Sequence, residues 1–240
     1  MTSPYDEGRR AEIAANLDRV EARIAAACRA AERDRAEITL VAVTKTFPAD
    51  DVGHLAALGV REVGENRAAD AAEKVAACRE AGVVTDLTWH FVGQVQTNKA
   101  ALVAGCCDVV HSVDRARLVT ALDKGAGAAG RRLRVLVQVD LAGTDGRGGA
   151  APADVPAIAA AVADAEHLDL AGVMAVAPLD EDPGEAFGRL AEVAEALRRE
   201  HPGAVVVSAG MSGDLEAAVA RGATHLRVGT ALLGSRPPLR

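Results

Sequence analysis

Aromatic residues are scarce in this chain and account for only 2% of its 240 residues. Half of the residues are hydrophobic, so alanine, valine and leucine must build a core, and the length is sufficient for a large one. No uncharged apolar run can span a bilayer, and the N-terminus lacks the basic start and apolar run of a signal peptide. The net charge of -7 offers no basic face to nucleic acid. We therefore expect a cytoplasmic protein that binds neither membrane nor nucleic acid.

Cysteine is sparse as well, and its spacing is not typical of a metal or redox site. Cys106 and Cys107 are adjacent, which does not suit an ordinary disulfide between them, and Cys28 and Cys78 stand apart. We interpret all four as buried thiols in a reducing compartment. The histidines of the central strands are interpreted as isolated strand-end residues, namely His90 and His111. No metal site is predicted.

Lysine is the rarest of the charged residues. The 27 lysine and arginine residues include only four lysines, which are Lys45, Lys74, Lys99 and Lys124. Arginine supplies charge but cannot form an imine, so a lysine at the mouth of a barrel is a candidate for covalent chemistry. Lys45 ends the apolar run Leu40–Lys45 and is that candidate. The alternative is a lysine that only extends its amine to solvent at a strand end.

Short apolar runs alternate with helical stretches along most of the chain. The first segment, roughly Asp6–Arg33, carries an apolar stripe at three- and four-residue spacing and is predicted to be a helix. The predicted strands are Ile38–Thr44, Val60–Gly64, Thr88–Gly93, Asp108–Val113, Arg134–Leu141, Leu170–Ala177, Ala204–Ser208 and His225–Gly229. The predicted helices between them include Ala49–Leu58, Asn66–Ala81, Arg115–Ala126, Ala153–Ala165, Gly184–Glu200 and Gly213–Ala220.

Eight alternating units predict an α/β fold in which a parallel sheet closes into a single (β/α)8 TIM-type barrel. The first helix is then an extra N-terminal element, and residues 1–240 form one domain. A doubly wound open sheet is the alternative, but it normally carries a glycine-rich fingerprint after its first strand. Here that position holds Thr44–Pro48, which is no dinucleotide loop.

The carboxyl ends of the predicted strands carry polar groups, and in a (β/α)8 barrel these ends form the functional rim. The last two strands end in small-residue turns, Ser208–Ser212 and Gly229–Thr230, which open helices and offer N–H and hydroxyl donors to an anion. The alternative for Ser212 is an ordinary helix cap. A lysine opposite a phosphate site suggests pyridoxal 5'-phosphate held on Lys45 as an imine. Arg227, on one side of an apolar strand, would face the pyridine nitrogen and keep it unprotonated.

At this point the chain resembles the pyridoxal phosphate homeostasis proteins, a family related to the N-terminal barrel domain of alanine racemase. The resemblance covers almost the whole chain and lies in Val41–Lys45, Gly64–Asn66, Trp89–Gly93, Gln96–Lys99, His111–Asp114, Gly172–Ala175, Ser208–Ser212, Arg227–Ala231 and Gly234–Arg236. The combination of Ser-x-Gly-Met-Ser, Arg-x-Gly-Thr and the early lysine is highly specific.

The resemblance implies a barrel that binds pyridoxal phosphate on Lys45, with Arg227 facing the pyridine nitrogen and Asn66 beside the ring. It implies a phosphate site made by Ser208, Met211, Ser212, Gly229 and Thr230. The family has no established catalytic activity and is linked to vitamin B6 homeostasis, so apo-enzymes that need the cofactor are candidate partners. One departure is Arg147, in a loop position where the family usually has lysine. Lys99 is the candidate substitute, although a solvated lysine at a helix start is the simpler interpretation.

Two other functions are considered. An amino-acid racemase needs a second acid or base on the opposite face of the substrate, and the only tyrosine here is Tyr5 near the N-terminus. A phosphate-sugar barrel enzyme would need rim carboxylates, for which Glu65 and Asp140 are candidates; a helix-terminal charge and a loop cap are their simpler interpretations. We expect a non-catalytic binder, and a monomer because no large apolar surface stripe is evident.

Overall fold

Eight parallel strands close into a barrel in a computed structural model that describes residues 4–83, 86–143 and 148–235. The strands follow chain order around the barrel, and the last pairs with the first, so that Leu40 lies opposite Leu226. The strands are β1 (Thr39–Val43), β2 (Glu62–Glu65), β3 (Thr88–Phe91), β4 (Val109–Val113), β5 (Leu133–Gln138), β6 (Leu168–Met174), β7 (Val206–Ser208) and β8 (His225–Val228). The predicted closed barrel is therefore confirmed.

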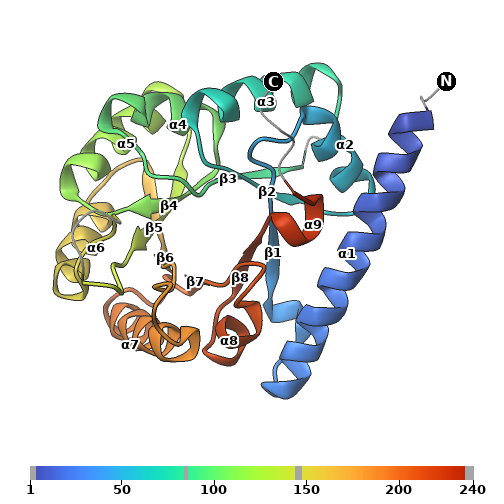
Figure 1. Ribbon diagram of the computed structural model, residues 1–240. Helices are drawn as coiled ribbons and strands as arrows, with labels where there is room; N and C mark the ends of the chain where they lie inside the picture. Colours follow the sequence, from blue (N-terminus) through green and yellow to red (C-terminus); the bar gives the residue numbers. More distant parts are fainter. Residues whose placement is uncertain (1–3, 84–85, 144–147, 236–240) are drawn as a thin grey trace.

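Helices surround the barrel on its outside (Figure 1). They are α1 (Pro4–Ala30), α2 (Ala49–Ala57), α3 (Ala68–Glu80), α4 (Ala100–Cys106), α5 (Ala116–Ala128), α6 (Val155–Ala163), α7 (Pro183–Glu200), α8 (Leu215–Ala220) and α9 (Thr230–Leu233). No helix among the described residues is both long and apolar enough to cross a membrane. The predicted segments differ from these mainly at their ends, and the largest differences among the strands are at β5 and β6, which were predicted over Arg134–Leu141 and Leu170–Ala177.

The larger apolar cluster lies between the strands and the helices, and its fully buried members include Phe91, Leu122 and Leu226. A second, small cluster consists of Leu136, Ala171, Met174 and Val206 on β5, β6 and β7. Strands buried on both faces read as near-continuous apolar runs, which explains why valine and alanine dominate them. Aliphatic side chains fill most of this space, together with a few aromatic residues such as Phe91 and Phe187.

Helix α1 lies along the outside of the barrel beside α2, α8 and α9 (Figure 1). Its apolar stripe is buried through Ile13, Val20 and Ile24. Its polar side chains reach the last turns of the chain, since the Asn16 amide donates to the carbonyl oxygen of Leu232 at 2.9 Å. The extra helix therefore fixes α9, whose first residues lie at the carboxyl ends of the strands.

Candidate functional site

A cavity of about 400 Å³ lies at the carboxyl ends of the strands, the rim at which barrel enzymes and binders place their sites. The residues that line it lie in or after β1 and β8 and after β2, β3, β6 and β7, so distant parts of the chain contribute. They are Val43, Lys45, Thr46, Phe47, Asn66, Val92, Gly93, Val176, Met211, Ser212, Gly213, Arg227, Gly229, Thr230 and Gly234. Its volume falls within the range of about 300–1,000 Å³ that is usual for small-molecule sites.

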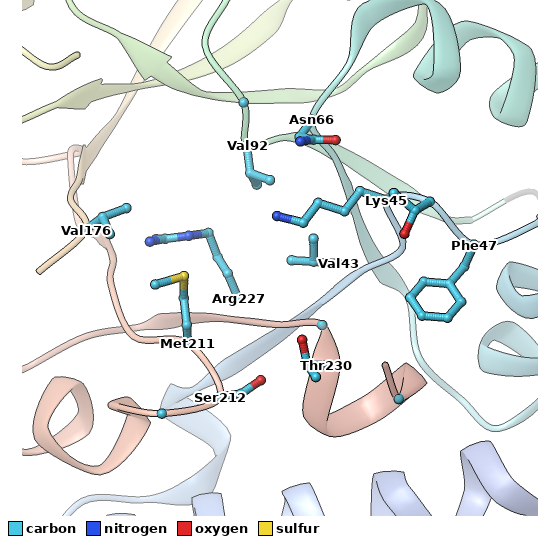
Figure 2. A pocket seen from close by; sticks show the side chains of 15 residues that line it. Val43, Lys45, Phe47, Asn66, Val92, Val176, Met211, Ser212, Arg227 and Thr230 are labelled. Atoms are coloured by element: carbon cyan, nitrogen blue, oxygen red, sulfur yellow. The ribbon is translucent and has the colours of Figure 1, made fainter. Parts of the chain in front are cut away.

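The side chain of Lys45 extends across this cavity toward the guanidinium of Arg227 (Figure 2). Asn66 and Val92 lie on one side of the lysine, and Ser212 and Thr230 lie on the other. Lys45 lies two residues after the end of β1, and the next residue, Thr46, has a backbone φ of 70°. A β-branched residue with this left-handed conformation is strained, and such strain is often stored at functional sites.

Arg227 gives the cavity a buried positive charge. The residue is 5% exposed, and its guanidinium donates to the Ser208 hydroxyl at 2.7 Å and to the Ala175 carbonyl oxygen at 2.9 Å. Both partners are neutral, and no carboxylate of the described residues forms an ion pair with it. Burial lowers the pKa of Arg227 to about 10, so the side chain remains a cation at neutral pH. Asp214 acts on this charge without forming an ion pair with it, so the buried cation favours an electron-rich ligand atom in the cavity.

Two small-residue turns form the opposite end of the cavity. Met211, Ser212 and Gly213 precede α8, while Gly229 and Thr230 begin α9. The Ser212 hydroxyl accepts from the N–H of Ala231 at 3.2 Å, so Ser212 caps the neighbouring helix α9 rather than its own helix α8, whose cap residue is Asp214. This bond ties the two turns together and presents hydroxyls and first-turn N–H groups to a bound anion.

Gly93 allows the ends of β2 and β3 to approach closely beside this cavity. A Cβ atom at Gly93 would lie 2.2 Å from the carbonyl oxygen of Asn66. This glycine belongs to the Trp89–Gly93 motif, and the close approach is the physical reason for it. Thr46, Val92 and Val176 were not predicted for the site, because their positions depend on the loop conformations.

We expect replacement of Gly93 with alanine to destabilise the protein by about 3 kcal/mol, because the added methyl group must displace backbone. Gly105→Ala is the matched control. No heavy atom lies within 4 Å of a Cβ at Gly105, and alanine is the better helix former there, in α4. Urea unfolding curves of the two variants compare their free energies of unfolding. Equal values would show that the strand ends can separate at little cost.

One of the eight residues predicted for the site, Ser208, does not line the cavity. It is fully buried at the end of β7, between Arg227 and His111, with its oxygen 2.9 Å from His111 Nδ1. Its place is therefore behind the arginine. The prediction that His90 and His111 are isolated is wrong, because His90 Nδ1 lies 2.7 Å from His111 Nε2.

Other candidate residues lie outside the cavity. Glu65 is fully buried and accepts from the Thr44 hydroxyl at 2.6 Å and from the Lys74 amine, and Asp140 accepts from the N–H of Ala142 at 2.9 Å. Neither carboxylate is among the described residues that line the cavity. Lys99 is exposed before α4 and Lys124 is exposed on α5. Arg147 lies outside the described residues.

The sequence and the fold are similar to those of known proteins. Residues 15–237 match the family described as alanine racemase, N-terminal domain. The pyridoxal phosphate homeostasis protein of Mycobacterium bovis is 46% identical over 95% of this chain and 94% of its own length. PipY of Synechococcus elongatus, solved with pyridoxal phosphate bound, is 33% identical with a TM-score of 0.80, covering 92% of this chain and all of that one.

A more distant structure shows the fold alone. Alanine racemase of Corynebacterium glutamicum is 18% identical, with a TM-score of 0.67 over 96% of this chain and 63% of that chain. The barrel described above is thus the fold shared with the racemase. Together with the near full-length match to curated relatives, these findings establish that the chain belongs to the pyridoxal phosphate homeostasis protein family, within the larger family of alanine racemase N-terminal domains.

Proposed function

We propose that this protein binds pyridoxal 5'-phosphate covalently through the Nζ atom of Lys45 and serves vitamin B6 homeostasis without turning over a substrate. The proposal depends on one observation: a single cavity is lined by Lys45, by buried Arg227 and by the turns before α8 and α9, which a hydrogen bond joins. When bound, the cofactor supplies an aldehyde that condenses reversibly with a primary amine and releases water. The relative PipY was solved with the same cofactor bound.

The residues present fit this ligand. Lys45 supplies the amine, and Ser212 and Thr230 with the adjacent glycines supply neutral donors for a phosphate group. Asn66 and Val92 lie beside the space for the ring (Figure 2). Arg227 lies within the cavity, and its positive charge would disfavour protonation of a pyridine nitrogen that faces it.

The lining also supports binding rather than turnover. Among the described residues that line the cavity, none is a histidine, tyrosine, cysteine or carboxylate, so this part of the lining supplies no second acid or base of the kind that a two-base racemase needs. Val176 is 47% exposed and Met211 is 39% exposed, so the mouth is open to solvent, as release to an apo-enzyme requires. We place the protein in the cytoplasm as a monomer; the four buried free cysteines support a reducing compartment.

A binding experiment with three ligands distinguishes the contribution of the lysine from that of the phosphate-binding turns. Pyridoxal phosphate carries both the aldehyde and the phosphate, pyridoxal lacks the phosphate, and pyridoxine 5'-phosphate lacks the aldehyde. We expect tight binding of the first only, weak binding of the other two, and a borohydride-trapped adduct with the first. Equal affinity for all three in equilibrium dialysis would contradict the proposal. Alanine racemisation faster than with the free cofactor, and lost in Lys45→Ala, would instead favour an enzyme.

Helix α1 is expected to strengthen phosphate binding because it fixes the turn before α8. Arg23 donates to the carbonyl oxygen of Ser212 at 3.0 Å and pairs with Glu216 at 2.9 Å. We expect Arg23→Ala to weaken pyridoxal phosphate binding roughly two- to tenfold, which corresponds to the net contribution of one ordinary hydrogen bond. Arg199→Ala is the control, since Arg199 forms an exposed pair with Glu195 on α7. Unchanged affinity in Arg23→Ala would show that the turn keeps its shape without α1.

A further inference from the structure

A chain of polar side chains crosses the interior of the barrel and ends at Arg227. Glu62 Oε2 lies 2.5 Å from His90 Nε2, and His90 Nδ1 lies 2.7 Å from His111 Nε2. His111 Nδ1 lies 2.9 Å from the oxygen of Ser208, which accepts from Arg227 at 2.7 Å. Since His111 on β4 reaches Ser208 on β7, the contact crosses the barrel. The two histidines and Ser208 are no more than 1% exposed.

Hydrogen-bond chemistry gives this chain one direction. A guanidinium only donates, so Ser208 accepts from Arg227, and its own proton must go to His111 Nδ1. A neutral His111 then carries its proton on Nε2 and donates to His90 Nδ1, and His90 donates from Nε2 to the Glu62 carboxylate. The reverse direction would leave the Ser208 hydroxyl facing two donors, with its own proton lacking an acceptor.

The electrostatics of the interior agree with this direction. Burial, together with the nearby charge of Arg227, holds the pKa of His111 well below its ordinary value, which keeps the ring neutral. Burial alone would raise the pKa of Glu62, but the bond from His90 brings it below its ordinary value, so the carboxylate stays ionised. His225 on β8 and Arg134 on β5 are the other charged or titratable groups that act on these rings. Burial and His90 lower the pKa of His225 to about 4.

A metal site does not account for the cluster. Among the described residues no group of three or more His, Cys, Asp or Glu side chains has an arrangement that could hold a metal ion. Each ring nitrogen of His90 and His111 already has a partner in the chain. The cluster is instead an internal support for the Arg227 guanidinium, whose other anchor is the Ala175 carbonyl oxygen at 2.9 Å.

We propose that Glu62, His90 and His111 are positioning residues for Arg227, with Glu62 as the terminal acceptor of the chain. Glu62 begins β2, so it lies at the rim opposite the cavity, and its side chain is 30% exposed. The chain fixes Ser208 as an acceptor and so holds the guanidinium in the cavity. This role rests on the proposed function, because it matters for ligand binding only if the cavity takes pyridoxal phosphate.

The first test uses the protein without cofactor and is independent of binding. Long-range proton–nitrogen NMR spectra of the histidine side chains distinguish the two neutral tautomers from the charged ring. At about pH 7 the proposal predicts the Nε2–H tautomer for both His90 and His111. An Nδ1–H tautomer or a charged ring at either position would overturn it, because the chain would then run in the other direction or end at His90.

The second test replaces Glu62 with glutamine, which keeps the shape but can donate as well as accept. We expect Glu62→Gln to mix the tautomers of both histidines, to change the pH titration of the visible band of bound pyridoxal phosphate, and to weaken its binding roughly two- to tenfold. Glu37→Gln is the control, since Glu37 forms an exposed pair with Arg33. Unchanged tautomers, spectrum and affinity in Glu62→Gln would refute the positioning role. Failure of the unmodified protein to bind the cofactor would refute the proposed function and leave the tautomer test standing.

Discussion

Replacement of Lys45 with alanine is expected to reduce the borohydride-trapped adduct of pyridoxal phosphate to background. Lys45 is the one lysine that lines the cavity, while Lys74 is bound to Glu65 and to the Thr44 carbonyl oxygen at 2.8 Å. The turns that would receive the phosphate are joined by the bond from the Ala231 N–H to the Ser212 hydroxyl. We therefore expect the variant to keep weak, reversible binding that inorganic phosphate competes away.

Lys99→Ala is the matched control for this variant because Lys99 is exposed and outside the cavity. It should retain the full adduct and the visible band. Mass spectrometry of the intact, borohydride-reduced proteins measures the amount of pyridoxyl adduct in both variants. A full adduct in Lys45→Ala would move the attachment to another lysine and would refute the assignment of the cavity.

Replacement of Arg227 with glutamate is expected to have the second largest effect. The change puts a carboxylate where a buried cation now lies and removes the donors to Ser208 and Ala175. A carboxylate facing the pyridine nitrogen favours its protonation, whereas the guanidinium opposes it. We expect a shifted visible band, a changed pH titration of that band and a clear loss of affinity.

Arg227→Lys separates charge from geometry in the same experiment. It keeps the positive charge but not the two-pronged geometry of the guanidinium, so the band should stay near that of the unmodified protein while affinity falls. Borohydride mapping checks that Lys45 remains the attachment point in this variant. An unchanged spectrum in Arg227→Glu would mean that Arg227 does not face the ring.

The barrel could be predicted because its causes are local. Each strand is a short apolar run, each helix has its own periodicity, and eight alternating units leave few ways to bury both faces of a parallel sheet. The same logic selected Lys45 and Arg227, since strand ends gather at one rim and alternation along β8 turns Arg227 inward. Both line the cavity, although roles in cofactor binding remain proposals.

The interior network could not be predicted, because its contacts are far apart in sequence. His111 and Ser208 are 97 residues apart and lie on strands that are not neighbours. Only the stagger of the closed barrel brings them together, and a sequence does not show which polar strand residue faces the cavity and which faces another side chain. Ser208 was therefore expected to line the site. The stagger of the strands places it behind Arg227 instead.

The contacts made by the polar face of α1 could not be predicted from the sequence either. The apolar stripe over Ile13, Val20 and Ile24 predicted an amphipathic helix, and these residues are buried. Which turns its polar face would contact depends on the angle at which the helix crosses the barrel. The contacts of Asn16 and Arg23 with Leu232 and Ser212 are therefore a result of the structure alone.

The most direct test of the account is the visible absorption spectrum of the purified protein with pyridoxal phosphate, before and after borohydride, followed by peptide mapping. The account predicts a visible band that borohydride removes and a pyridoxyl group on the peptide that contains Lys45. A protein that stays colourless with added cofactor, or a pyridoxyl group on Lys74, Lys99 or Lys124, would contradict the account.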